Sequence, residues 1–239
     1  MLRTLKTLRY LLRVARTFPF DQPWAERFVQ KFPDLSGRAV VREQFLEELA
    51  AGRRVLHFGF LDAPFMEDKV ARGDLVHARL RRVAARVYGV DIDAEALERY
   101  RAATGDADNG IADVGDSAAT AQLPQGFDLV LFPEVLEHVQ NPGLVLSHLR
   151  DLCLRNGGAT LCVTTPNAFN APWFMSALGG REIVHPEHYY YFSPYTLRRL
   201  LESVGFTDVR IGMYGPPELV NPQGITGYGL TALCVPVPR

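Results

Sequence analysis

Short apolar runs alternate with helical patterns from about residue 54 onward, and this alternation constrains the fold more than any other feature of the sequence. The runs are continuously apolar, as in "FDLVLF" (127–132) and "ATLCVTT" (159–165), which is typical of parallel strands covered on both faces. Strands that alternate with helices of about ten residues form right-handed βαβ units. The sequence therefore predicts an α/β fold with a doubly wound sheet.

The remaining predicted elements follow in regular order. Further strands are expected at 54–58, 86–90, 110–114, 207–213 and 228–235. Helices are expected at 38–51, 75–84, 94–102, 144–154 and 193–205. Ser193 is placed to cap the last helix, and His77 is interpreted as a helix-surface residue. Residues 166–192 are rich in Pro, Asn and aromatic residues, and a loop this long in a compact domain predicts an aromatic-rich lid.

Composition and charge narrow the classes of function. The 239 residues carry a formal net charge of −1, which argues against a nucleic-acid partner held by electrostatics. Cys153, Cys162 and Cys234 form no CxxC pair and no zinc pattern, which indicates buried free thiols in a reducing compartment. No stretch is long and apolar enough to span a bilayer and no secretory signal is recognisable, so we expect a cytoplasmic protein.

The first 52 residues are expected to form an N-terminal helical segment ahead of a domain spanning 53–239. Residues 1–17 combine a stripe of leucines with five basic side chains. A basic amphipathic helix of this kind either lies on a membrane surface or an anionic substrate, or packs on the domain with its charges toward water. We favour the second interpretation, and the sequence leaves both open.

Polar and acidic residues follow strand after strand, at the edge where ligands bind in such sheets. Gly59 follows the first strand, Asp91 ends the second, Asp116 follows the third, and "PEVLEHV" (133–139) follows the fourth. Asp93 is the better cap for the next helix, which leaves Asp91 free to bind both ribose hydroxyls of an adenosine. This edge of the sheet is therefore the expected ligand site.

Five stretches of the chain occur in an ordered series: "RVLHFG", "YGVDID", "DVGDSAATAQLPQGFDLVLFPEVLEHVQNP", "GGATLCVTTPN" and "HYYYFSPYTLRRLLESVGF". This series, over about residues 53–213, resembles the class I S-adenosylmethionine-dependent methyltransferases. Within them it is similar to the group of ubiquinone-pathway O-methyltransferases and small-molecule and sugar methyltransferases. The resemblance implies a Rossmann-like sheet of seven strands with the last strand antiparallel, and S-adenosyl-L-methionine as cofactor.

The resemblance also implies roles for single residues. It implies that Gly59 lies against the methionine part of the cofactor and that Asp91 binds the ribose. It implies Asp116 and Ser117 near the adenine amino group. The expected cofactor-binding residues are Gly59, Asp91, Ile92, Asp116, Ser117 and Pro133.

The loop after the first strand departs from the family's usual Asp-x-Gly-x-Gly-x-Gly. His57 stands where an acid is common, and Phe60, Leu61 and Asp62 stand where further glycines are expected. A methyl donor carries no pyrophosphate and needs fewer glycines, and Gly59 keeps the point of close backbone approach. Asp62 is expected to contact the donor's ammonium group. The departure leaves a degenerate, nonbinding fold as an alternative.

Glu134, Glu137 and His138 are spaced i, i+3 and i+4, so a helix after Pro133 would put them on one face. Two carboxylates and an imidazole can hold a divalent cation such as Mg²⁺. Similar E-x-x-E-H stretches bind Mg²⁺ in ubiquinone-pathway and small-RNA 2′-O-methyltransferases, and the latter add a downstream histidine where His188 stands here. The expected ligands are thus Glu134, Glu137, His138 and His188, unless the carboxylates bond to backbone amides or arginines instead. Without a metal, His138 or His188 is the expected general base.

Together these features predict an enzyme that methylates an oxygen of a small molecule or glycan. The alternatives are a degenerate methyltransferase fold acting as a binding or scaffold subunit, and an N-methyltransferase on the same scaffold. The lid and the N-terminal helices, which the resemblance covers least, are expected to select the acceptor.

Overall fold

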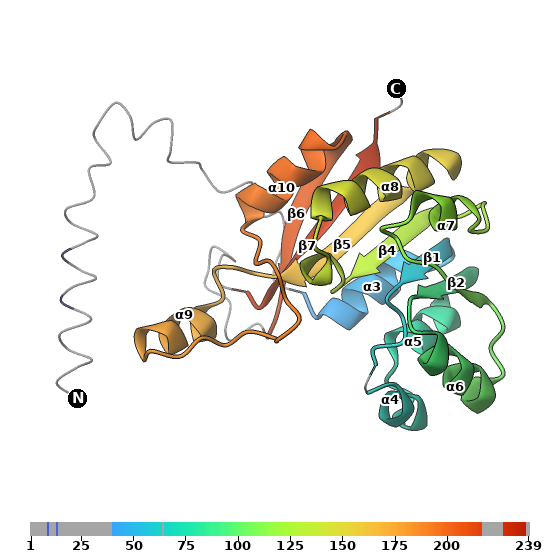
Figure 1. Cartoon of the computed structure of the whole chain (residues 1–239), viewed down its shortest axis with the longest axis horizontal. Helices are drawn as coiled ribbons and strands as arrows, with labels where there is room; N and C mark the ends of the chain where they lie inside the picture. The colour runs from blue at the N-terminus through green and yellow to red at the C-terminus, as the bar shows by residue number, and fades with distance from the viewer. Residues whose placement is uncertain (1–8, 10–12, 14–39, 64, 217–226, 238–239) are drawn as a thin grey trace.

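The protein is built around one seven-stranded sheet. The computed structural model describes residues 9, 13, 40–63, 65–216 and 227–237 (Figure 1). The strand order is β3-β2-β1-β4-β5-β7-β6, and among the described strands β7 alone runs opposite to the other six, which confirms the predicted fold. The strands are β1 (Arg54–Phe58), β2 (Arg86–Asp91), β3 (Asn109–Ile111), β4 (Leu129–Pro133), β5 (Thr160–Pro166), β6 (Phe206–Tyr214) and β7 (Gly229–Pro236).

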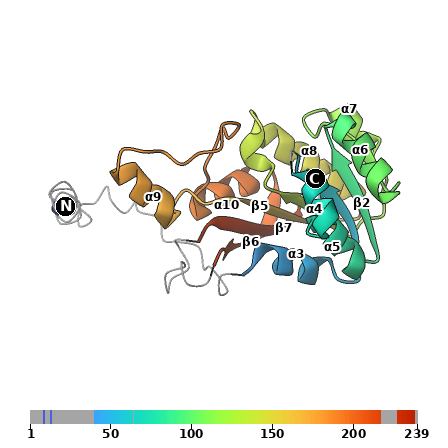
Figure 2. The same cartoon turned by 90° about the horizontal axis from the view of Figure 1, so that it is seen from below.

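Helices cover both faces of the sheet (Figure 2). On one face, α3 (Arg42–Ala50) and α5 (Val76–Val83) pack against side chains such as Val55 and Leu129. On the other face, α8 (Pro142–Arg155) and α10 (Pro194–Ser203) pack against the alternate side chains, such as Leu56. Because both faces are buried, the strands are apolar throughout rather than alternating.

A third hydrophobic cluster lies at the β2 end of the molecule. It joins α4 (Met66–Arg72), α6 (Ala94–Thr104) and the loop after β1 through Phe60, Leu61, Met66, Leu75 and Tyr100. The short helix α7 (Ser117–Ala121) follows β3 on the way to β4.

The strand predictions agree with the structure to within three residues, whereas three α-helices, α4, α7 and α9, were not predicted. The helix α4 lies in the detour after β1 and ends at Gly73, whose φ of 71° suits the left-handed C-cap. Ser193 caps α10 in a capping box with Thr196, as predicted. The amphipathic helix expected over 1–17 lies outside the described residues, apart from Arg9 and Arg13, which are helical. Within the described ranges, no helix has the length and apolar character needed to cross a lipid bilayer.

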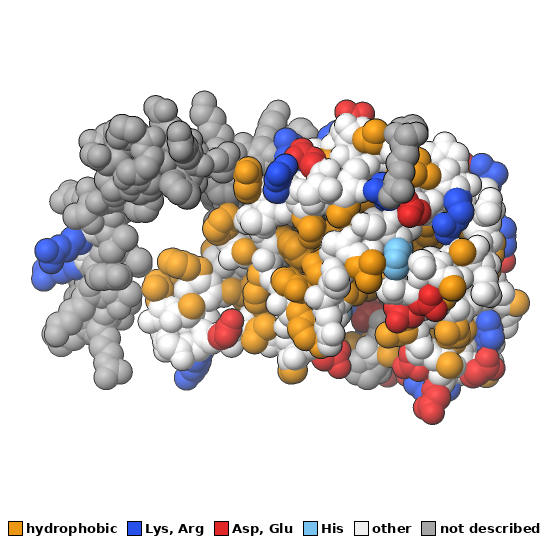
Figure 3. Space-filling model, turned by 45° about the horizontal axis from the view of Figure 1, so that its top comes forward, with side chains coloured by type: hydrophobic (Ala, Val, Ile, Leu, Met, Phe, Trp, Pro, Cys, Tyr) orange, Lys and Arg blue, Asp and Glu red, His pale blue; other side chains and the backbone are white. Residues whose placement is uncertain are grey.

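The segment between β5 and α10 carries another unpredicted helix, α9 (Ala171–Leu178), which stands out from the body of the molecule (Figure 1). Asn170 caps it by accepting a hydrogen bond from Trp173 N at 3.3 Å. The segment closes on itself at its base, where Asn167 pairs with Phe192. Hydrophobic side chains gather on the surface of this part of the molecule (Figure 3), among them Phe174 and Met175, which are 54% and 60% exposed.

Candidate functional site

The carboxyl ends of β1 and β2 lie side by side, and this brings Gly59 next to Asp91. Phe58 and Val90 are in register, and Gly59 N donates to Val90 O at 2.9 Å. Gly59 has a φ of 63°, and a Cβ atom there would lie 2.5 Å from Val135 Cγ2. Glycine is therefore required at this turn for both conformation and space, and its exposed backbone remains accessible at the edge of the sheet.

Asp91 organises the backbone around it. Its Oδ2 accepts from Leu61 N at 3.1 Å, and its Oδ1 accepts from Ile92 N at 2.8 Å and from Asp93 N at 3.3 Å. The Asp93 side chain caps α6, as predicted. A carboxylate has about four lone-pair sites, so three amides leave one free on Oδ2. Asp91 can thus accept one ribose hydroxyl as it stands, and a second only in exchange for an amide.

The other residues expected to bind the cofactor follow β2, β3 and β4 at the same edge of the sheet. Ile92 is 70% exposed beside Asp91. Asp116 caps α7 by accepting from Ala118 N at 2.8 Å, and Ser117 is the exposed first residue of that helix. Pro133 is the last residue of β4. The sheet therefore gathers the expected set at one edge, although one of the two carboxylate oxygens of Asp116, Oδ1, is already engaged by its own helix.

The unusual loop after β1 turns its large side chains into the core. Phe60 and Leu61 are 2% and 0% exposed. The Phe60 ring lies 4.4 Å from the ring of His77 and 5.2 Å from that of Tyr100 between centroids. A Cβ atom on Gly89 would come within 2.7 Å of the Phe60 ring, so β2 makes room for it with a glycine. The loop thus departs from the family pattern to fill a hydrophobic cluster, while its backbone still borders the site.

His77 and His57 belong to a buried polar chain rather than to a surface or to the cofactor site. The interpretation of His77 as a surface residue is wrong, because its side chain is 0% exposed. His57 Nδ1 lies 3.3 Å from His77 Nδ1, and His77 Nε2 lies 3.4 Å from Asp106 Oδ2. The same Asp106 carboxylate accepts from the Tyr100 hydroxyl at 2.9 Å and pairs with Arg81 at 2.6 Å.

Burial and hydrogen bonding set the charges along this chain. Burial lowers the pKa of His57 well below its ordinary value, and the neighbouring His77 adds to the effect. Burial also raises the pKa of Asp106, but hydrogen bonds from His77, the Asp108 amide and Tyr100, together with the charge of Arg81, outweigh it and hold that pKa far below its ordinary value. His57 is therefore a neutral core residue and does not replace the acid usual at this position.

Asp62, expected near the donor's ammonium group, has a left-handed backbone with a φ of 53°. Its carboxylate pairs with Lys69 on α4. Asp62 is exposed, but its charge is already shared with a cation, so it is a weaker candidate for this contact than the sequence indicated.

The stretch after β4 does not form the expected helix. Glu134 has a φ of 52°, and only a 3₁₀ turn follows, η1 (Leu136–His138). Glu134 Oε1 accepts from Thr164 Oγ1 at 2.7 Å, whereas Glu137 Oε2 accepts from Thr165 Oγ1 at 3.0 Å. The prediction that Glu134, Glu137 and His138 share one helical face is therefore wrong, because the left-handed turn at Glu134 redirects its side chain.

Arg42 and Tyr214 complete the surroundings of Glu134, and no motif in the sequence pointed to either residue. Arg42 Nη1 from α3 lies 3.9 Å from Glu134 Oε1, and its guanidinium lies 5.9 Å from the centre of the Tyr214 ring. Burial raises the pKa of Glu134, and the charge of Arg42 opposes this. Burial, together with the charge of Glu134, raises the pKa of Glu137 to about 8. One arginine thus faces the half-buried carboxyl group of Glu134, which lies next to the buried carboxyl group of Glu137.

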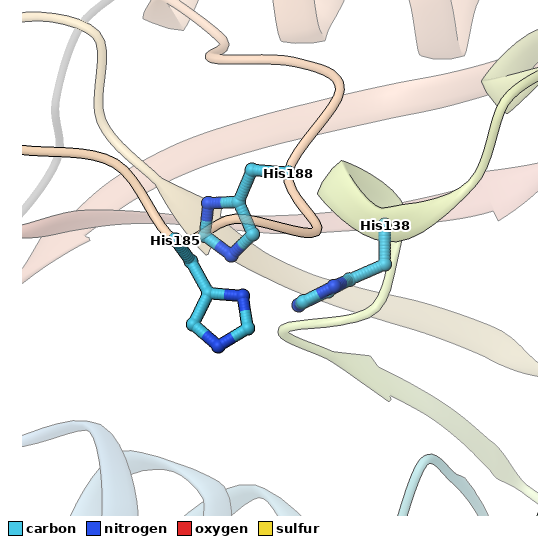
Figure 4. A group of neighbouring side chains, drawn as sticks. All are labelled: His138, His185 and His188. Atoms are coloured by element: carbon cyan, nitrogen blue, oxygen red, sulfur yellow. The ribbon is translucent and has the colours of Figure 1, made fainter.

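His138, His185 and His188 form a cluster that the sequence did not predict (Figure 4). Of the residues that the structure describes, they are the only group of three or more His, Cys, Asp or Glu whose ligand atoms all lie within 4.8 Å of one another. The expected ligand set of Glu134, Glu137, His138 and His188 does not meet this condition, so the structure does not fit Mg²⁺ there. His185, expected only to shape the lid, joins the cluster instead.

Two of these imidazoles are uncharged at neutral pH. Burial, with the charges of His138 and His185, lowers the pKa of His188 to about 4. Burial and His185 likewise lower the pKa of His138. A neutral imidazole can accept a proton or bind a metal ion.

A cavity of about 470 Å³ lies between the lid and the ends of the central strands. Three of its lining side chains are polar groups of the site: Glu134, His185 and His188. Its other walls are mainly aromatic and apolar: Pro166, Pro172, Trp173, Ile183, Val184, Tyr191, Tyr214 and Tyr228. A second hollow, of about 630 Å³, is lined by residues such as Thr160 and Arg210 and contains none of the predicted site residues. The first cavity is therefore the candidate acceptor site.

Comparison with known proteins agrees with this geometry. A family model described as a methyltransferase domain matches residues 37–211. A ubiquinone biosynthesis O-methyltransferase of Proteus mirabilis (strain HI4320) is 32% identical over 116 residues, which cover 47% of this chain and 46% of that protein. The match thus spans about half the length of this relative.

Solved methyltransferase structures share the fold. The magnesium protoporphyrin IX methyltransferase of Synechocystis PCC 6803 with bound S-adenosylhomocysteine has a TM-score of 0.52 at 18% identity, over 82% of this chain and 84% of that one. A possible histamine N-methyltransferase of Thermotoga maritima has a TM-score of 0.53 at 15% identity, over 82% and 87%. The fold, the matching family model and the site edge lead to one conclusion: the chain belongs to the class I S-adenosylmethionine-dependent methyltransferases.

Proposed function

We propose that this methyltransferase transfers the methyl group to a hydroxyl oxygen of a ring-containing small molecule or glycan. The observation that carries the proposal is the cavity of about 470 Å³, which combines walls such as Trp173 and Tyr191 with a few polar groups. Its volume lies in the range of about 300–1,000 Å³ that small-molecule sites occupy, and such sites typically join apolar walls to a few placed polar groups. Aromatic side chains of this kind stack on flat or ring-shaped ligands. The O-methyltransferase among the relatives is consistent with an oxygen acceptor.

The donor would lie at the neighbouring edge, over Gly59 and beside Asp91. The open backbone at Gly59 suits the methionine part, and the free lone pair on Asp91 Oδ2 suits one ribose hydroxyl. Ile92, 70% exposed, offers an apolar surface next to the ribose contact for the adenine ring. Asp116 and Ser117 lie beyond it after β3 and are proposed to border the adenine amino group.

The transfer itself is an in-line displacement. The carbon–oxygen bond forms as the carbon–sulfur bond breaks, and the electron pair of that bond stays on sulfur in S-adenosylhomocysteine. His188 lines the cavity, with the His138 ring 4.5 Å away between centroids, so we propose these imidazoles as acceptors of the hydroxyl proton. Positioning of the two reactants supplies most of the rate, because the sulfonium is already activated.

The test is a methyl-transfer assay with labelled S-adenosylmethionine against matched sets of acceptors. Each set pairs an aromatic or sugar hydroxyl compound with its amine analogue. Mass spectrometry of the product then locates the methyl group. Methylation of the hydroxyl members, reduced in His188→Ala, would support the proposal. Methylation of the amine members alone would contradict it in favour of N-methylation.

A further inference from the structure

We propose that His138, His185 and His188 form a binding site for one Zn²⁺ or similar first-row transition metal ion, at the rim of the acceptor cavity. This differs in ligands and in metal from the mixed set of carboxylates and imidazoles expected from sequence. The proposal rests on the cluster itself and not on the proposed function.

The three rings already lie nearly close enough to share an ion. Their centroids are 4.5 Å apart for His138 and His188, 5.1 Å for His185 and His188, and 5.5 Å for His138 and His185. Tetrahedral zinc with Zn–N distances of about 2.0–2.1 Å requires nitrogens about 3.4 Å apart. Because the ligand atoms lie within 4.8 Å of one another, each pair has to close by at most about 1.4 Å. His185 is exposed, so side-chain rotation can supply this movement.

The local chain holds the imidazoles together. A turn in which His188 N donates to His185 O at 3.0 Å brings these two residues of an H-x-x-H sequence onto the same side (Figure 4). The next residue, Tyr189, donates its amide to Glu137 O at 2.8 Å. That hydrogen bond fixes the turn beside η1, where His138 lies. The backbone therefore positions all three side chains without a metal ion.

The surroundings of the cluster suit metal-binding imidazoles. His138 Nδ1 lies 3.9 Å from Glu187 Oε2, beyond hydrogen-bond distance, so this exposed carboxylate would have to move closer to orient the ring. His185 Nδ1 accepts only a long hydrogen bond, 3.3 Å, from Glu187 N. His188 Nδ1 is buried and has no hydrogen-bond partner among the described residues. A long or missing hydrogen bond costs little to exchange for a metal ligand.

The ligand type decides which ion is expected. Imidazole nitrogens suit zinc, copper, cobalt and nickel, whereas Mg²⁺ prefers oxygen ligands. Three protein ligands leave a fourth position open, and it would face the cavity that His185 and His188 line. An ion on all three would also join the lid to η1. The same imidazole nitrogen cannot bind an ion and accept a proton, so the proton-acceptor role proposed for His138 and His188 applies to the ion-free protein.

The experiment measures metal binding directly on the full chain without a polyhistidine tag. The protein is stripped with a chelator, and Zn²⁺ affinity is determined by competition with a chromophoric chelator. Co²⁺ absorption then reports the coordination geometry. Mg²⁺ serves as the negative control, because it is not expected to bind. His185→Ala is the decisive variant, because His185 is exposed and does not belong to the ligand set of carboxylates and imidazoles expected from sequence. His148→Ala, at a half-buried histidine of α8 that bonds to Val114 O, is the matched control.

Binding of one Zn²⁺ per chain would support the proposal if the affinity falls at least about tenfold in His185→Ala and is unchanged in His148→Ala. Loss of groups that only hydrogen-bond to metal ligands already costs about 10–100-fold in affinity, so loss of a ligand should cost at least as much. Wild-type affinity in His185→Ala would overturn it, as would the absence of Zn²⁺ binding to the folded protein. In either of those cases the proposed methyl transfer still stands, because the labelled-donor assay tests it separately.

Discussion

Replacing Phe60 by Ala tests whether the loop after β1 was modified for packing or for ligand binding. The Phe60 side chain is 2% exposed and packs against His77, Tyr100 and the surface of Gly89. Truncation of a buried Phe to Ala costs about 3–5 kcal/mol, because it loses the burial of the ring and leaves a cavity. For a domain of this size each kcal/mol lowers the melting temperature by about 2–4 °C, so we expect a fall of about 6–20 °C.

Urea unfolding followed by circular dichroism gives the free energy, and calorimetric titration of S-adenosylmethionine at a temperature where the variant is folded gives the affinity. We expect the donor affinity of Phe60→Ala to stay within about threefold of wild type, equivalent to well under 1 kcal/mol. Phe65→Ala is the control, because Phe65 lies in the same loop but is 58% exposed. Its unfolding free energy should change by no more than about 0.5 kcal/mol. A Phe60→Ala protein of wild-type stability that binds the donor poorly would refute the packing interpretation.

Three further substitutions test separate parts of the account. Asp106→Asn should lower the unfolding free energy at pH 7 by about 3 kcal/mol, since it removes a buried carboxylate that accepts from the Tyr100 hydroxyl and pairs with the exposed Arg81. The folded-state pKa of Asp106 is depressed, so its contribution to stability is present above the unfolded pKa of about 4 and is lost as the pH falls. The difference in unfolding free energy between Asp106→Asn and wild type should therefore shrink between about pH 5 and 2. Gly59→Ala should weaken donor binding at least about tenfold in calorimetry, because its φ of 63° and the contact with Val135 both oppose a Cβ atom. Trp173→Ala should raise the KM for a cyclic acceptor about tenfold with little change in kcat, through the loss of about 1–1.5 kcal/mol of stacking.

Each of these has a matched control elsewhere in the chain. Asp108→Asn removes a more exposed carboxylate whose ion pair with Arg86 lies at the surface, and should cost less than about 1 kcal/mol. Gly52→Ala introduces the same backbone strain at a φ of 69° with no atom within 4 Å, and should leave donor binding unchanged. Phe174→Ala removes an exposed aromatic side chain of α9 and should not alter KM. Equal effects in a variant and its control would contradict the specific role assigned to the first residue.

The sheet was predictable because its strands are buried on both faces and are therefore apolar without interruption. Such runs, for example 127–132, can be recognised as strands from the local sequence alone. The helix α4 was missed because its seven residues are too few to show a clear 3.6-residue period. It also follows a proline, in a loop that usually has no helix. The helix α9 was missed because its eight residues bury none of their side chains, so no apolar stripe distinguishes it from the surrounding loop.

The site was predictable where it depends on the sheet alone. Gly59 and Asp91 follow neighbouring parallel strands and could be placed by topology. The grouping of Glu134 with His138 was wrong because the left-handed residue at 134 could not be read from the sequence. His185 and Arg42 reach the site through tertiary packing of the lid and of α3, and no local spacing signals such contacts.

The central claim is that the altered loop still serves a methyl donor at the edge of β1 and β2. The most direct measurement is calorimetric titration of S-adenosylmethionine into the metal-free protein, with Asp91→Ala and, as control, Asp128→Asn. Asp128 pairs with Arg54 at the amino-terminal ends of β4 and β1, away from the proposed donor site, and should not affect donor binding. We predict binding at about micromolar concentration in wild type and in the control, and at least about tenfold weaker binding in Asp91→Ala. Absence of heat in the wild type, confirmed by failure of S-adenosylhomocysteine to bind, would contradict the account, as would wild-type affinity in Asp91→Ala.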